Sequence, residues 1–250
     1  MKTIIVQNEG NHDRVGPETG SWQTHCRESV RLYAEKMGWD YKVTSYDESF
    51  DWYPSRYARG LNQILACYQP SYDYVIQLEN DHYIWGLPRW EQASFVTRES
   101  YPAFGRTESR VSTPWIAGTQ ERMNSLVSFV LAQESTSTRD PEVQQLMDSM
   151  NENTSDEELF RIWCARETGV KIYPSNRRGA GYTPYTNMYV DWVYRDTIIH
   201  LSGRHKQFQW ESLQTLMESD DPLALQRMML YAHPNCLLGD PEKNWTKYPH

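Results

Sequence analysis

The sequence has no apolar run that approaches the roughly 18 residues of a membrane-spanning helix. Its first residues, MKTIIVQNEG, turn polar after a short apolar stretch, so we predict a first β-strand there rather than a signal peptide. Cysteine is scarce, and the four residues Cys26, Cys67, Cys164 and Cys236 form no CxxC pair and no zinc-binding spacing. These features favour a cytoplasmic protein with reduced, buried cysteines and no membrane span.

An excess of positive charge is also missing. The formal net charge is −8 and the pI is about 5.4, which gives no general attraction to nucleic acid or to anionic membranes. A local basic patch remains open, with Arg177, Arg178 and residues 204–206 as its candidates. Internal repeats and low-complexity linkers are absent, and 39% hydrophobic with 23% charged residues is typical of a globular chain. Its 250 residues fit one large domain, or one domain with a helical appendage.

The most informative segment that is present is YDYVIQLENDHYIWG, residues 72–86. Residues 74–78 predict a buried strand that ends in Glu79, Asn80 and Asp81. Acidic groups at the carboxyl end of a central α/β strand lie where such sheets open their ligand crevice. Carboxylates two residues apart can converge there on one hard divalent cation, which could neutralise a diphosphate and help it leave. The plainer alternative is a strand that ends in a polar turn, because acidic turn residues are common.

The order of predicted elements favours an α/β protein. Strands alternate with helices over the first third of the chain, and this β-α-β-α-β order indicates a mainly parallel sheet covered by helices. The predicted strands are residues 2–7, 41–44, 74–78, 93–96, 114–118, 170–173 and 197–201, and the predicted helices are residues 21–37, 55–68, 123–133, 139–152, 156–168 and a final region at 209–231. We therefore expect a first domain at residues 1–206 and a helical extension at residues 207–250.

A segment rich in Gly, Tyr and Asn, residues 176–189, is a candidate substrate loop. Its Tyr182, Tyr185 and Asn187 could contact an acceptor, because Tyr offers a stacking face and Asn offers paired hydrogen bonds. The chain has ten Trp and seventeen Tyr, which suits sugar rings, but aromatic residues also fill cores. A structural loop with inward-packed tyrosines is therefore the alternative.

The second motif is HLSGRHK, residues 200–206, which follows the last predicted strand. Gly203 allows the backbone to approach a ligand closely. Lys206 can meet a phosphate as a point charge, and His200 can offer an imidazole nitrogen to a metal.

HLSGRHK fits the HxxGxxK pattern of the retaining GT-A glycosyltransferases of the glycogenin and bacterial lipopolysaccharide galactosyltransferase type, and the chain resembles this family. YDYVIQLEND stands where the family has an aspartate-x-aspartate motif, with Glu79 for the first aspartate and Asp81 for the second. SRYARGLNQIL resembles the helix that precedes that motif, with Arg59 at the arginine. Downstream, WIAGTQ and SDEELF resemble two further segments through the residues Gly118, Asp156 and Glu157.

The resemblance covers residues 1–206 and implies a GT-A-like, Rossmann-like fold and a metal-dependent transferase. Such an enzyme moves a hexose or pentose from a nucleotide-diphosphate sugar, such as a UDP-sugar, to an acceptor, with retention of configuration. The acceptor could be a carbohydrate, a lipid-linked group or modified nucleic acid. By the resemblance, Mn²⁺ or Mg²⁺ is held by Glu79, Asp81 and His200. The residues that contact the donor are then Asn8, Arg59, Glu79, Gly118, Gly203 and Lys206. The catalytic residues Asp156 and Glu157 orient hydroxyl groups.

Two other functions stay open at this point. A non-catalytic nucleotide- or sugar-binding protein could use the same scaffold, and Glu79 in place of an aspartate keeps that reading alive. A glycoside hydrolase using Glu79 and Asp81 is less favoured, because carboxylates so close along a chain rarely straddle a bond at the ~5–9 Å separation that such hydrolysis requires.

Overall fold

The computed structural model describes residues 1–9, 21–85, 93–100, 110–152, 154–173, 175–178, 188–193, 196–201, 206–207, 210–211, 214 and 218. In chain order the elements are β1 (Thr3–Asn8), α1 (Ser21–Met37), β2 (Asp40–Thr44), the 3₁₀ turn η2 (Ala58–Gly60), α2 (Leu61–Leu65), β3 (Tyr74–Glu79), β4 (His82–Trp85), β5 (Phe95–Ser100), β6 (Arg110–Thr119), α3 (Gln120–Ala132), α4 (Pro141–Ser149), α5 (Glu157–Arg166), β7 (Val170–Tyr173), β8 (Ser175–Arg178), β9 (Met188–Val193) and β10 (Asp196–Leu201).

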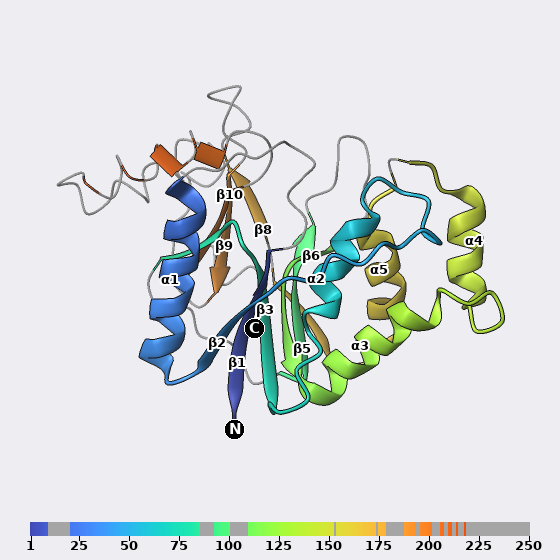
Figure 1. Ribbon diagram of the computed structural model, residues 1–250, viewed down its shortest axis with the longest axis horizontal. Helices are drawn as coiled ribbons and strands as arrows, with labels where there is room; N and C mark the ends of the chain where they lie inside the picture. The colour runs from blue at the N-terminus through green and yellow to red at the C-terminus, as the bar shows by residue number, and fades with distance from the viewer. Residues whose placement is uncertain are drawn as a thin grey trace, which may run out of the picture.

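A six-stranded sheet in the order β2-β1-β3-β6-β5-β7 forms the centre of the molecule. β1 is parallel to β2 and β3, β7 is parallel to β5, and β6 alone runs antiparallel to its neighbours β3 and β5. Helix α1 covers one face, and α2, α3 and α5 cover the other (Figure 1). The mainly parallel α/β sheet with flanking helices that the sequence predicted is therefore confirmed.

Two hydrophobic clusters occupy the two faces of this sheet. Ile4 and Val6 of β1 face one cluster, whereas Ile5 faces the other, because side chains alternate along a strand. The same alternation in β3 places Val75 on the side of α2, α3 and α5 and Ile76 on the side of α1. Every one of these side chains is at most 1% exposed, so both faces of the sheet are sealed.

Helix α1 has the limits that the sequence predicted. Gly38 ends it with φ +69°, a left-handed conformation that glycine adopts without strain. The amide of Gly38 donates to the carbonyl of Glu35, and the amide of Trp39 donates to that of Ala34, which is the Schellman pattern. The helix predicted at residues 55–68 is shorter than expected, because only η2 and α2 are helical.

A second, antiparallel sheet in the order β4-β10-β9-β8 was not predicted. It lies at the carboxyl end of β1 and β3 (Figure 1). The prediction of a loop over residues 176–189 is wrong at both ends, where β8 and β9 pair with each other. The composition of this segment predicts a loop, but Arg178 pairs with Met188 only ten positions further along the chain. Residues 179–187 lie outside the described residues.

Most of the predicted helical extension, residues 207–250, also lies outside the described residues, but its beginning is described. Lys206 and Trp210 lie in helical backbone, and both side chains are buried. The described Cys26, Cys67 and Cys164 are free and buried. Within the described ranges, none of the helices has the length and apolar character that crossing a membrane requires.

Candidate functional site

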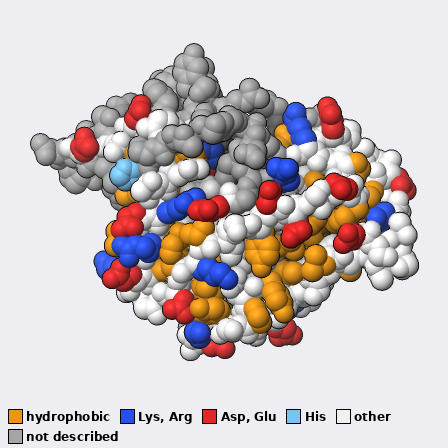
Figure 2. Space-filling model, viewed as in Figure 1, with side chains coloured by type: hydrophobic (Ala, Val, Ile, Leu, Met, Phe, Trp, Pro, Cys, Tyr) orange, Lys and Arg blue, Asp and Glu red, His pale blue; other side chains and the backbone are white. Residues whose placement is uncertain are grey.

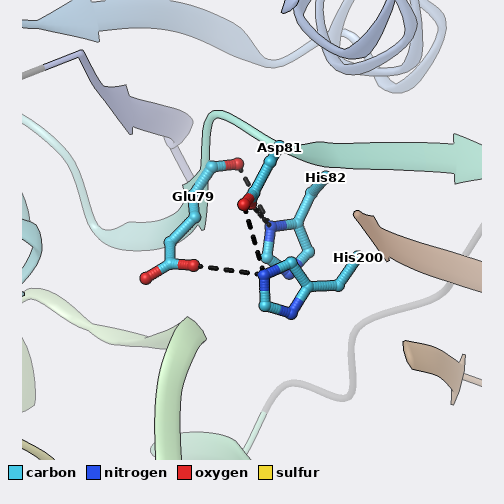
Figure 3. Close-up of side chains that lie close together, drawn as sticks. All are labelled: Glu79, Asp81, His82 and His200. Carbon is cyan, nitrogen blue, oxygen red and sulfur yellow. Dashed lines mark hydrogen bonds and ion pairs between the residues drawn. The ribbon is translucent and has the colours of Figure 1, made fainter. Parts of the chain in front are cut away.

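The carboxyl end of β3 carries a cluster of four polar side chains that come from two distant parts of the chain. Glu79 ends β3, Asp81 lies in the turn that follows, and His82 begins β4. His200 is the β10 residue directly opposite His82 in the second sheet. The amide of Leu201 donates to the carbonyl of Asp81 at 3.0 Å and fixes β10 to this turn. Figure 3 shows the four side chains turned toward one another.

The cluster is compact. Nε2 of His200 lies 3.4 Å from Oε2 of Glu79 and 3.3 Å from Oδ2 of Asp81. The imidazoles of His82 and His200 stack with their ring centroids 4.5 Å apart and an interplanar angle of 11°. One ligand atom from each of the four residues falls within 4.8 Å of the others.

Both carboxylates are ionised despite their burial. Burial by itself raises the pKa of Asp81, but the Lys206 ammonium and His200 bring that pKa well below its ordinary value. Burial likewise raises the pKa of Glu79, but the hydrogen bond from His200 and the electrostatic effects of the two histidines together bring that pKa below its ordinary value. The cluster therefore presents anionic oxygens at neutral pH.

The hydrogen bonds of the two histidines assign their protons. Nδ1 of His82 lies 3.2 Å from the carbonyl oxygen of Glu79. A carbonyl only accepts, so Nδ1 carries the proton and Nε2 is left with its lone pair. Nε2 of His82 is buried and has no hydrogen-bond partner among the described residues. Burial lowers the pKa of His82, which keeps this imidazole neutral.

His200 has the opposite arrangement. Its Nδ1 lies 3.4 Å from Nη1 of Arg98, and a guanidinium can only donate. The proton of His200 is therefore on Nε2, directed at the two carboxylates. Burial lowers the pKa of His200, but the neighbouring Asp81 raises it above its ordinary value overall. Without a cation, Nε2 is therefore a donor, and it can coordinate a metal ion only when this proton is lost.

A lysine completes the site. The ammonium of Lys206 donates to Oδ2 of Asp81, and Lys206 is only 8% exposed. The same Nζ lies 5.2 Å from the ring centroid of Trp22 in α1. The site thus combines two anions with a buried ammonium and, on the far side of His200, a buried guanidinium.

The residues fit a divalent cation. Two carboxylates and two imidazoles within 4.8 Å of one another are a ligand set that such ions use. Oδ1 of Asp81 is buried and lies 3.3 Å from Nδ1 of His82, but it makes no well-formed hydrogen bond to a described residue, which is costly for an anionic oxygen that no cation satisfies. The neighbouring Asn80 has a similarly buried Oδ1. This acidic and histidine cluster can therefore hold a metal ion.

Four of the residues proposed from the sequence come together here, namely Glu79, Asp81, His200 and Lys206. Asn8 is next to Glu79 in the register of β1 and β3. Its side chain, however, binds the loop after β2: Oδ1 accepts from the amide of Tyr46 at 2.8 Å, and Nδ2 donates to the carbonyl of Tyr46 at 3.0 Å. In the structure, the side chain of Asn8 therefore fixes the backbone of the loop that follows β2.

Arg59, Asp156 and Glu157 lie in a second group, around η2 and the beginning of α5. Arg59 is half exposed and 3.9 Å from Asp47. The carboxylate of Asp156 lies against Gly60, where an added Cβ would come within 2.0 Å of its Oδ2. Gly60 therefore leaves the space that the Asp156 side chain occupies.

Gly118 lies toward the opposite end of β3, where it pairs with Val75. An added Cβ would come within 2.9 Å of both Cδ2 of Phe95 and the carbonyl of Ser94, so close packing of β5 and β6 explains this glycine. The structure does not bring Gly118 to the cluster. Gly203, Tyr182, Tyr185 and Asn187 lie outside the described residues.

Sequence reasoning missed His82 and Arg98. His82 follows Asp81 directly, so three potential ligands within four residues were visible as a signal. Arg98 stands in the strand FVTRES, and a charged residue after a buried apolar run is an unusual choice. Arg98 is 4% exposed, and its contact with His200 joins β5 to β10.

No family model and no curated protein matches the chain. The solved structures that it resembles include a glycosyltransferase involved in the glycosylation of the major capsid of PBCV-1, with 12% identity, a TM-score of 0.47 and coverage of 86% of this chain and 100% of that chain. The inositol-1-phosphate CTP transferase from T. maritima has 10% identity, a TM-score of 0.35 and coverage of 70% and 85%. A197 from STIV has 10% identity, a TM-score of 0.28 and coverage of 50% and 68%. Likenesses of this strength fix neither a family nor an activity, so the function is inferred from the site itself.

Proposed function

We propose that the protein is a metal-dependent glycosyltransferase that moves a hexosyl or pentosyl group from a nucleotide-diphosphate sugar to an acceptor. The observation that carries the proposal is the convergence of two carboxylates, two imidazoles and one ammonium at the carboxyl end of β3. Crevices of α/β sheets open at this end of the strands. The same site combines ligands for a cation with a cation for a phosphate, which is the pairing that a metal–diphosphate complex needs.

In this proposal, Glu79, Asp81 and the imidazoles of His82 and His200 hold the ion. Imidazole ligands favour Mn²⁺ over Mg²⁺, which prefers oxygen. The ion supplies Lewis-acid stabilisation of the departing diphosphate. Lys206 adds a positive charge on the same leaving group. The loop that Asn8 holds after β2 meets the base or ribose, and Asp156 and Glu157 orient hydroxyls of the donor or acceptor.

The acceptor side of the proposal rests on Tyr182, Tyr185 and Asn187. Tyrosine rings stack on sugar or base rings, and asparagine forms paired hydrogen bonds. We expect Tyr182→Ala and Tyr185→Ala to lower transfer to an acceptor more than hydrolysis of the donor by water. Equal loss of both activities would assign these tyrosines to the donor site or the core instead.

The direct test is a screen of nucleotide-sugars, with UDP-sugars first, for hydrolysis in the presence of Mn²⁺, Mg²⁺ or EDTA. We expect one donor to be hydrolysed with Mn²⁺ and spared with EDTA. Hydrolysis that EDTA does not change would show that the activity does not depend on a metal. Binding of nucleotide-sugars without any turnover would show that the protein is not an enzyme for these donors.

A non-catalytic nucleotide- or sugar-binding protein is the second candidate, and the ion pair of Lys206 with Asp81 favours it. That contact already neutralises the carboxylate on which a cation would depend. Calorimetric titration of nucleoside diphosphates with and without Mn²⁺ separates the candidates: affinity that Mn²⁺ does not change, together with an intact donor, indicates the binding protein.

A further inference from the structure

Lys206 and a divalent cation would both bind the carboxylate of Asp81. The ammonium of Lys206 contacts Oδ2 of Asp81, which also lies 3.3 Å from Nε2 of His200. A cation held by Asp81 and His200 would bind the same carboxylate as the ammonium. Asp81 is 1% exposed and Lys206 is 8% exposed, so little water is present to screen the repulsion between the two positive charges.

The position of Lys206 is fixed by its own segment. Trp210, four residues further along in helical backbone, is 2% exposed. Its ring stacks on His25 of α1, with centroids 4.6 Å apart, and lies 5.4 Å from the ring of Tyr83 in β4. This packing holds Trp210 against α1 and β4, and the ammonium of Lys206 lies over the ring of Trp22 and contacts Asp81.

His200 strengthens the competition. Because Arg98 donates to Nδ1, Nε2 of His200 carries a proton toward both carboxylates. The protein's own donors therefore occupy Oδ2 of Asp81 from two sides. Oδ1 of Asp81 lies 3.3 Å from Nδ1 of His82 but makes no well-formed hydrogen bond to a described residue, so it is the oxygen that an entering cation can contact first.

We propose that Lys206 and the divalent cation are alternative partners of Asp81, and that cation binding releases the Lys206 ammonium to the diphosphate of the nucleotide. This inference rests on the proposed function. Glu79 and Asp81 together carry two negative charges and Lys206 carries one positive charge, so a divalent cation alone leaves a net positive charge in a buried site. A nucleoside diphosphate supplies the missing negative charge. Cation and nucleotide are therefore expected to bind together far better than the cation binds alone.

The test measures Mn²⁺ affinity from the electron paramagnetic resonance signal of free Mn²⁺, first without nucleotide and then with UDP, GDP, ADP or CDP. Lys206→Met keeps the length of the side chain and removes its charge. We expect this variant to bind Mn²⁺ alone about 10-fold more tightly than the parent, since one repelling charge is gone. At saturating Mn²⁺, it is expected to bind the preferred diphosphate about 10-fold more weakly, since one charge-assisted contact is lost.

Two matched variants separate charge from other effects. Lys206→Arg keeps the positive charge and is expected to stay near the parent in Mn²⁺ affinity. Lys36→Met removes an exposed lysine at the end of α1 and is expected to change neither affinity. If Lys206→Met binds Mn²⁺ alone no more tightly than the parent, the competition is disproved.

A second measurement needs no variant. Acetylation of the wild-type protein with acetic anhydride, read by mass spectrometry, reports how accessible each lysine amine is. Mn²⁺ alone is expected to raise the labelling of Lys206 severalfold and leave that of Lys36 unchanged, and a bound diphosphate is expected to protect Lys206 again. No rise with Mn²⁺ would overturn the inference even if Lys206→Met failed to fold.

Failure of the proposed function would look different. If Lys206→Met binds Mn²⁺ more tightly and the diphosphate more weakly, but no nucleotide-sugar is hydrolysed, then the competition is supported in a binding protein rather than an enzyme. If the parent hydrolyses a nucleotide-sugar with Mn²⁺ but Lys206→Met shows neither change in affinity, then the proposed enzyme activity is supported and the competition is disproved.

Discussion

Two aspartates flank strand β3, and their surroundings could hardly differ more. Asp73 precedes the strand, is exposed, and accepts a hydrogen bond from the backbone amide of Lys2 at 2.6 Å. Asp81 follows the strand, is 1% exposed, and contacts Lys206 and His200. Both residues are acidic turn residues beside the same buried strand. The second sheet distinguishes them, because its strands β4 and β10 lie at the carboxyl end of β3, next to Asp81 (Figure 1).

The comparison shows what burial does to a carboxylate. Water hydrates Asp73, so this side chain needs no special partner. At the other end, burial penalises the charged form of Asp81, and Lys206 and His200 must offset that penalty to keep it ionised. The molecular surface in Figure 2 carries many acidic and basic side chains of the first kind. A buried charge such as that of Asp81 is screened less by water, so it interacts more strongly with a cation or a phosphate.

The largest effect is expected from Asp81→Asn. The substitution keeps the shape of the side chain and removes an anionic ligand, so Mn²⁺ affinity should fall by more than about 100-fold, beyond the usual loss for a supporting residue. Calorimetric titration with Mn²⁺ measures it, and circular dichroism verifies the fold. Donor turnover in the presence of Mn²⁺ should vanish with it. Turnover equal to that of the parent would remove Asp81 from the metal site.

His200→Ala and His82→Ala test whether the second sheet contributes metal ligands at the carboxyl end of β3. Each removes one imidazole from the four-residue cluster, and each is expected to weaken Mn²⁺ binding by about 10–100-fold. Ile199→Ala, which changes the β10 residue next to His200, serves as the control in the same strand. If both histidine variants bind Mn²⁺ like the parent, the cluster is a structural polar network rather than a metal site.

Much of the central sheet could be predicted from the sequence, because β1 and β3 are short buried runs with β-branched residues, a signal that is local in the sequence. Glu79 and Asp81 were found for the same reason, since they directly follow such a run. His82 and Arg98 were not found as site residues, because their roles depend on partners more than a hundred positions away: His82 pairs with His200 across the second sheet, and Arg98 contacts the same imidazole. Strand pairing of this kind is set by tertiary contacts.

A moderate effect on stability, with none on the metal, is expected from Gly118→Ala near the amino end of β3. The new methyl group would come within 2.9 Å of Phe95 and of the Ser94 carbonyl, and relief of that overlap should cost about 1–3 kcal/mol. Urea denaturation measures the free energy of unfolding, and Mn²⁺ affinity is the internal control. Unchanged stability together with weaker nucleotide binding would instead indicate that Gly118 contacts the donor.

The smallest effect is expected from Asp73→Asn, the counterpart of Asp81→Asn at the other end of the same strand. The carboxamide oxygen still accepts from the amide of Lys2, and only the screened charge is lost, so the free energy of unfolding should change by less than about 0.5 kcal/mol. Asp73→Ala also removes the acceptor, and should cost about 1 kcal/mol. Mn²⁺ affinity should equal that of the parent in both variants. A loss of Mn²⁺ affinity as large as that of Asp81→Asn would mean that overall charge, rather than enclosure by the second sheet, governs cation binding.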